Sequence, residues 1–332
     1  MELLIYLILF LLVLIVSSTT NKLLPFLPLP LVQILLGIVI GLFLPNTDFH
    51  LNTELFLALV IGPLLFRESE EADITAILKH WRIIVYLIFP VIFISTLSLG
   101  GLAHLLWLSL PLAACLAVGA ALGPTDLVAF ASLSERFSFP KRVSNILKGE
   151  GLLNDASGLV AFQVALTAWT TGAFSLGQAS SSLILSILGG FLIGFLTAMT
   201  NRFLHTFLLS VRATDIASEL LLELSLPLVT FFLAEEVHVS GIIAVVVAGI
   251  LKASRFKKIT LLEAQVDTVT ETVWHTVNFM LNGSVFVILG MELEMIAEPI
   301  LTNSIYNPIL LLVSLIALTF VLFAIRFVMI YG

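Results

Sequence analysis

The chain has 332 residues, of which 59% are hydrophobic and only 11% are charged, and its mean hydropathy is +1.14. This composition excludes an ordinary water-soluble globular protein and places the chain in a lipid bilayer. The single cysteine, Cys115, excludes a disulfide framework or a cysteine metal site within one chain. The formal net charge of −7 says little by itself, because the positions of the charges matter more than their sum.

Apolar runs between polar breaks predict about eleven membrane crossings. They lie near residues 3–17, 31–45, 51–66, 83–104, 109–134, 141–170, 180–201, 215–235, 239–252, 270–295 and 306–330. The runs lack the alternation of a β-barrel, so their backbone must be satisfied in helices. We therefore expect an all-α, polytopic membrane helix bundle that forms one transmembrane domain over residues 1–332. The first run is a retained span, because Glu2 precedes it and it lacks a basic leader.

Lys and Arg occur in alternate loops of this map. The loops at 46–50, 104–108, 171–179, 236–238 and 296–305 contain none, whereas the intervening loops hold almost all of them. Positive charge marks the cytoplasmic side of a membrane protein. The pattern predicts a multi-pass protein of the plasma membrane with an external N-terminus and a cytoplasmic Gly332.

Two polar segments interrupt the spans on the predicted cytoplasmic side. Residues 67–82 combine apolar residues on one helical face with acids elsewhere, which predicts an amphipathic helix at the membrane interface. Residues 253–268 form a second segment of this kind, which we expect to be a cytoplasmic linker.

A helix break is predicted in the middle of the fifth span, at Gly123-Pro124-Thr125-Asp126. Pro124 removes a helical hydrogen bond, and apolar sequence continues on both sides of the break. Freed carbonyls, the Thr125 hydroxyl and the Asp126 carboxylate would then face a cavity that suits a cation. The alternative is a loop at the interface in which Asp126 caps a helix.

The sixth span opens with a second polar cluster, Glu150-Gly151-Leu152-Leu153-Asn154-Asp155. Glu150 and Asn154 are four residues apart and share a helical face, while Asp155 belongs to the adjacent one. Burial disfavours the ionised form of an aspartate, so a proton and a dehydrated cation can compete for its oxygens. The alternative is a water-exposed first helical turn that is rich in acids.

Arg326 is the only basic residue in the last apolar span. A cation at that depth needs an acidic partner or must snorkel to the cytoplasmic surface. Glu150 is the partner that we expect.

Four segments in order resemble the electroneutral cation/proton antiporter family, which includes bacterial sodium/proton antiporters and animal sodium/proton exchangers. They are Gly-Pro-Thr-Asp at 123–126, Gly-Glu-Gly-Leu-Leu-Asn-Asp-Ala at 149–156, Phe-Val-Ile-Leu-Gly-Met-Glu-Leu at 286–293 and Ala-Ile-Arg-Phe at 324–327. The resemblance covers nearly the whole chain and implies an inverted-repeat antiporter fold with a discontinuous fifth helix.

The resemblance also implies roles for individual residues. Asp155 would be the carboxylate shared by the proton and the cation, and Thr125 and Asp126 would help to shape the site. Asn154 stands where an electrogenic relative carries a second aspartate, which implies one-for-one exchange. Glu150 and Arg326 would form a buried structural ion pair that holds Asn154.

The chain departs from the family pattern in two places. Gly151 occupies a position where serine is common, so a water molecule would replace one side-chain oxygen near the cation. The family fold continues after the arginine-bearing helix, whereas this sequence stops at Gly332, so we expect a sequence truncated at its C-terminus.

Together these features predict a secondary transporter, not an enzyme, that exchanges sodium, or lithium or potassium, for a proton by alternating access. No cofactor and no nucleic acid are expected, and the partners are the lipid bilayer and a second copy in a homodimer. The alternative is a truncated, non-transporting membrane protein that acts as a sensor or subunit.

Among weaker features, Glu219 and Glu223 would line an inner funnel or a partner surface, or lie in a helix start together with Asp215.

Overall fold

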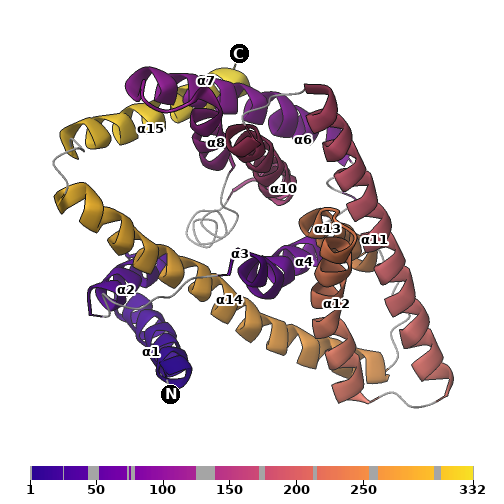
Figure 1. The fold of residues 1–332 in the computed structure, drawn as a ribbon. Coiled ribbons are helices and arrows are strands. Elements are labelled where there is room, and N and C mark those ends of the chain that lie inside the picture. Colours follow the sequence, from indigo (N-terminus) through magenta and orange to yellow (C-terminus); the bar gives the residue numbers. More distant parts are fainter. Residues whose placement is uncertain are drawn as a thin grey trace.

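The computed structural model is helical almost throughout the residues that it describes, and no strand occurs among them (Figure 1). The described residues are 2–24, 26–43, 52–72, 75, 79–124, 139–171, 176–211, 215–253, 261–302 and 308–331. This confirms the all-α fold that the composition and the long apolar runs predict.

Each of the predicted spans overlaps a helix or a continuous run of helical segments. In chain order these are α1 (Glu2–Leu23), α2 (Leu29–Phe43), α3 (Thr53–Phe56), the π-helical η1 (Leu57–Ile61), α4 (Gly62–Glu71), α6 (Trp81–Tyr86), the π-helical η2 (Leu87–Val91), α7 (Ile92–Leu106), α8 (Leu112–Leu122), α10 (Lys141–Thr171), α11 (Leu176–Ser210), α12 (Ile216–Glu236), α13 (Gly241–Ala253), α14 (Leu261–Thr302) and α15 (Pro308–Tyr331).

Several of these helices are long and apolar enough to cross a bilayer. Within the described residues they are Ile184–Ser210, Ile216–Glu236, Thr268–Leu293 and Ile309–Met329, and shorter apolar helices accompany them. On α15, Leu312, Phe320 and Phe323 are exposed, which suits contact with lipid chains rather than with water. The chain is therefore an integral membrane protein.

The helices fall into two groups. The α10 group consists of α6, η2, α7, α8, α10 and α15, and the α13 group consists of α1 to α4 and α11 to α14; Figure 1 shows the α10 group gathered at the top of the view. Each group has its own apolar core. Leu99, Cys115 and Leu318 pack together in the first, and Phe66, Val245 and Trp274 pack together in the second. Among the described residues, the two groups meet where α10 packs against α4.

Close helix crossings depend on glycine in the α13 group. A Cβ atom at Gly290 on α14 would lie only 2.9 Å from the Cα atom of Gly37 on α2. Such a distance is too short for real side-chain carbons, so the two helices reach this separation only because both residues lack a side chain.

The structure describes only parts of the two predicted polar segments, and residues 73, 74 and 76–78 of the first lie outside it. Arg67–Glu71 do not begin a separate interfacial helix but complete α4, because Arg67 pairs with Glu70 and Glu71 on that same helix. The helix ends at Ala72, where the backbone becomes extended. Of the predicted linker, residues 254–260 lie outside the described part, and Leu261–Thr268 already form the first turns of α14.

Candidate cation site

The site begins where α8 ends. Its last helical residue is Leu122, and Gly123 follows as the residue that caps the helix. Pro124 has no N–H group, so it cannot continue the helical hydrogen-bond ladder. Gly123 is at the helix end, and its carbonyl oxygen accepts a hydrogen bond from outside the helix. The regular helix stops at the position where the sequence predicts the break.

Glu150 and Asn154 face each other along α10. Both side chains are buried, with 3% and 1% of the residue surface exposed, and Asn154 Nδ2 donates a hydrogen bond to Glu150 Oε1 over 3.2 Å. The spacing of four residues places them one helical turn apart on one face. A buried carboxylate needs such donors, because burial removes its contact with water.

Arg326 on α15 completes this arrangement. Its Nη1 atom lies 3.4 Å from Glu150 Oε1, and its Nη2 atom donates a hydrogen bond to the carbonyl oxygen of Gly123 over 2.8 Å. One guanidinium group therefore joins the end of α8, the start of the buried part of α10 and α15. Its rigid, forked geometry suits two acceptors at once.

The other predicted site residues are placed less completely. Asp155 lies on α10 directly after Asn154, but its side chain is outside the described part of the structure. Thr125 and Asp126 also lie outside the described residues. Gly151 is buried on α10 and offers no side-chain oxygen. The structure thus brings Glu150, Asn154, Arg326 and Gly123 together, and it leaves the ligand role of Asp155, Asp126 and Thr125 as a prediction.

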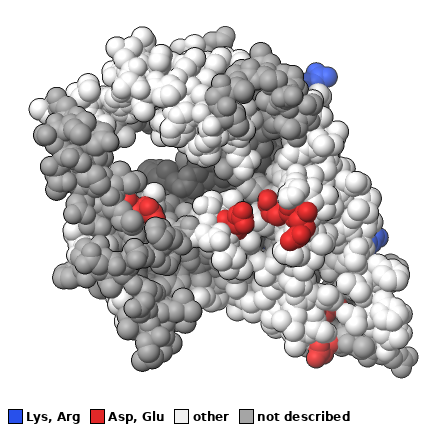
Figure 2. Space-filling model, in the orientation of Figure 1, with Lys and Arg blue, Asp and Glu red and all other residues white. Residues whose placement is uncertain are grey.

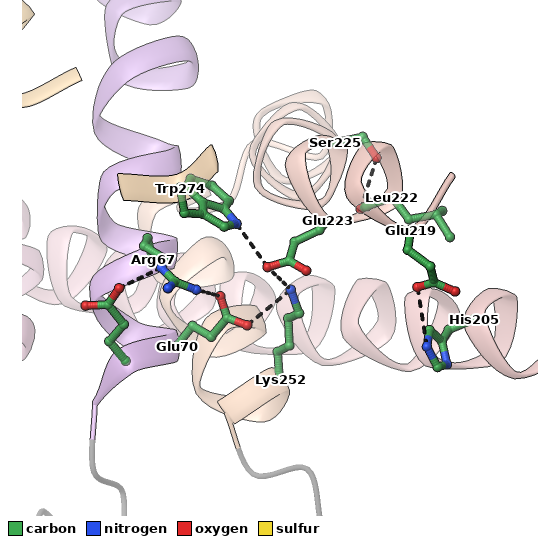
Figure 3. Close-up of polar contacts among 10 residues, drawn as sticks. Arg67, Glu70, His205, Glu219, Leu222, Glu223, Ser225, Lys252 and Trp274 are labelled. Carbon is green, nitrogen blue, oxygen red and sulfur yellow. Dashed lines mark hydrogen bonds and ion pairs between the residues drawn. The ribbon is translucent and has the colours of Figure 1, made fainter. Parts of the chain in front are cut away.

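A second polar group, which we call the ionic cluster, lies in the α13 group and is shown in Figure 3. It consists of Arg67 and Glu70 from α4, Glu223 from α12, Lys252 from α13 and Trp274 from α14. Lys252 Nζ lies 3.1 Å from Glu70 Oε1 and 2.8 Å from Glu223 Oε1. Since Lys252 is largely buried, it bridges two carboxylates away from bulk water.

Aromatic rings extend the ionic cluster. Trp274 Nε1 donates a hydrogen bond to Glu223 Oε1 over 2.9 Å, and the Arg67 guanidinium lies 5.8 Å from the centre of the Trp274 ring. Cations at this distance from an aromatic face are attracted to it. The ionic cluster therefore ties together the carboxyl ends of α4 and α13 with residues of α12 and α14.

The family model described as "Sodium/hydrogen exchanger, transmembrane" matches residues 7–332. The chain belongs to the sodium/hydrogen exchanger family. This confirms the family that the four sequence segments indicate.

Named relatives support membership of the exchanger family. The chain is 36% identical to a protein named "Sodium, potassium, lithium and rubidium/H(+) antiporter" from Bacillus pumilus, over 98% of this chain and 48% of that protein. It is also 36% identical to the protein of the same name from Bacillus subtilis, over 94% of this chain and 47% of that protein. It is 31% identical to the "Uncharacterized Na(+)/H(+) exchanger YjcE" of Escherichia coli, over 93% of this chain and 56% of that protein. The chain spans about half the length of the curated relatives that it matches.

A solved structure shares the fold of this exchanger-family chain. The sodium proton antiporter MjNhaP1 from Methanocaldococcus jannaschii at pH 8 superposes with a TM-score of 0.66 and 22% identity, over 88% of this chain and 71% of that one. At this identity the likeness concerns the fold alone, and it confirms the antiporter-like helix bundle.

Several carboxylates that the sequence leaves open have helix-packing or capping partners in this exchanger-family chain. Glu223 belongs to the ionic cluster, and Glu219 Oε2 on α12 lies 3.3 Å from His205 Nε2 on α11. Asp215 caps α12 by accepting a hydrogen bond from the Ser218 backbone N–H over 2.7 Å. Figure 2 shows Asp and Glu in several patches on the face in view, with Lys or Arg visible at its edge.

The sequence reasoning missed Lys252, Trp274 and the Gly123 carbonyl. Spacing along one helix predicts which residues share a face, but it does not say which residues of different helices meet. The only sequence signal was that Lys252 stands at the end of an apolar span, where a lysine is also expected to reach for water.

Proposed function

We propose that this chain exchanges sodium, or another monovalent cation such as lithium or potassium, for a proton across the plasma membrane. Membership of the sodium/hydrogen exchanger family supports the proposal, as do the names of the two Bacillus relatives. The observation that carries it is the Arg326 contact with both Glu150 and the end of α8. It provides a compensated buried acid next to the end of α8, and Asp155 follows that acid by five residues on α10.

The proposed chemistry is competition at one carboxylate. Glu150 already has the Arg326 guanidinium and the Asn154 amide as partners, so it is held in a structural role. Asp155 would then bind either a proton or a dehydrated cation, with Thr125 and Asp126 supplying further oxygens. Hard monovalent cations are well suited to carboxylate, hydroxyl and carbonyl oxygens. Because the two ions use the same oxygens, one leaves when the other binds.

The proposed movement is that of the α10 group against the α13 group. Each group has its own apolar core, and within the described residues they meet where α10 packs against α4. A rigid group that slides past another can expose one site to each side of the membrane in turn. The ionic cluster would keep the α13 group rigid during this movement, and a homodimer would hold that group in place.

The topology follows from the loop charges. We propose that the N-terminus is external, that Gly332 is cytoplasmic and that residues 1–332 act as a single transmembrane unit with no resident cofactor. The carboxyl ends of α4 and α13, which contribute Arg67, Glu70 and Lys252 to the ionic cluster, are helix ends that the positive-inside pattern assigns to the cytoplasmic side.

Proteoliposomes test the proposal. A sodium gradient applied to vesicles that contain the chain should drive proton movement, and Asp155→Asn should abolish it. Glu71→Gln is the matched control, because the Glu71 side chain is 57% exposed and lies far along the chain from Asp155. Proton movement that survives Asp155→Asn at the original rate would refute the proposal.

A further inference from the structure

Gly158 on α10 is buried directly against Pro124 at the helix break. A Cβ atom at position 158 would overlap Pro124 Cγ and would lie 3.1 Å from Pro124 Cδ. The proline ring is closed onto the backbone, so it cannot rotate away as a flexible side chain would. The absence of a side chain at Gly158 thus sets how closely α10 approaches the break.

The position of this contact connects it to the candidate site. Gly158 follows Asp155 by three residues, so the two positions lie on the same side of α10, one turn apart. Pro124 immediately precedes Thr125 and Asp126 in the sequence. Arg326 in turn donates a hydrogen bond to the carbonyl oxygen of Gly123, the residue before Pro124. The break is therefore held by Arg326 at one residue and by Gly158 at the next.

We propose that Gly158 is a positioning residue that fixes the distance between the helix break and the turn of α10 that carries Asp155, and that it thereby sets the cation preference. This inference rests on the proposed function. A site with ligands on two separate elements selects ions through the spacing of those elements and the number of oxygens that they offer. A Cβ atom at position 158 would push the elements apart by about 1 Å, a displacement that can cost up to about 100-fold in a positioned site.

The test compares Gly158→Ala with Gly101→Ala. Gly101 lies on α7, and a Cβ atom there would meet nothing within 4 Å, so its replacement adds the same atom without a clash. Purified variants would be unfolded by heat in sodium, lithium, potassium and rubidium chloride, since a bound cation raises the unfolding temperature. Initial rates of cation-driven proton movement would be measured for the same four ions.

Gly158→Ala should weaken the apparent affinity for the smaller ions about tenfold and shift the order of preference toward the larger ones. Gly101→Ala should leave both unchanged. A purely structural role for Gly158 would lower stability in every salt equally and keep the order of preference. A folded Gly158→Ala protein with the original order would overturn the inference.

A second pair of variants covers a Gly158→Ala protein that does not fold. Pro124→Ala removes the ring atoms that the new Cβ would meet, so Pro124→Ala/Gly158→Ala should fold and restore part of the original preference. The two changes should be strongly non-additive in a double-mutant cycle, whereas additive effects would overturn the inference. If the unmodified chain shows neither cation-dependent stabilisation nor flux, the proposed function itself fails.

Discussion

Arg326 on α15 reaches the end of α8, where its Nη2 atom donates a hydrogen bond to the carbonyl oxygen of Gly123 over 2.8 Å. The same side chain lies 3.4 Å from Glu150 on α10 through Nη1. A group that contributes to both contacts links the helix break to a buried acid. In the proposed cation site, Arg326 would hold the geometry without binding the cation itself.

Replacement of Arg326 tests this dependence. Arg326→Met should lower the free energy of unfolding by about 3 kcal/mol, because it leaves the buried Glu150 carboxylate without its cation. Arg326→Lys should recover only part of the loss, since an ammonium group lacks the fork that contacts two acceptors. Unfolding in detergent measures both changes. Adding Glu150→Gln to Arg326→Met should restore stability, and a double variant as unstable as Arg326→Met alone would contradict this interpretation.

Asn154→Asp should make stability depend on pH. The asparagine amide donates to Glu150 Oε1, whereas an aspartate can donate only when it is protonated. At low pH the protonated side chain keeps the hydrogen bond, and as pH rises the two carboxylates repel each other in the folded state. The melting temperature relative to the unmodified chain should therefore fall as the pH rises. Asn154→Leu is the control, and the difference between its melting temperature and that of the unmodified chain should stay constant with pH.

The break and the paired residues could be foreseen to different extents. Gly123-Pro124 within an apolar run predicts where α8 ends, because proline cannot continue a helix. Sequence reasoning pairs Arg326 with Glu150 because a lone cation at that depth requires an acid, and the two side chains do lie together. The second contact of Arg326 was not foreseeable, since every residue has a carbonyl oxygen and nothing in the sequence marks that of Gly123.

The ionic cluster shows more clearly which contacts a sequence alone does not predict. Glu223 and Lys252 come from different helices, and their pairing depends on how α12 and α13 cross. The place of residues 67–71 in α4 was also not predicted. Their acids suggest an interfacial helix, but the ion pairs of Arg67 with Glu70 and Glu71 stabilise the end of α4 instead.

Loss of Lys252 should destabilise the α13 group. Lys252→Met leaves Glu70 and Glu223 partly buried and without the ammonium group that lies between them, at a cost of about 3 kcal/mol. Glu71→Gln changes an exposed residue of the same region and should stay within about 0.5 kcal/mol. Chemical unfolding of both variants gives the comparison. Equal stability of the two would show that the bridge contributes little.

The crossing of α2 and α14 should tolerate no added carbon. Gly290→Ala places a Cβ atom 2.9 Å from the Gly37 Cα atom, so the helices must separate, at a cost of about 2 kcal/mol. Gly101→Ala again supplies the control, because it adds a methyl group into open space. Thermal unfolding that is the same for both variants would argue against a tight crossing.

The central claim is that a proton and a cation compete for the Asp155 carboxylate, and calorimetry of cation binding tests it most directly. Sodium titrated into the purified chain in buffers of different ionisation enthalpy reveals how many protons leave as the ion binds. At a pH below the range in which the site titrates, the account predicts the release of about one proton per cation, and it predicts no binding by Asp155→Asn. Cation binding without proton release, or binding that Asp155→Asn retains, would contradict it.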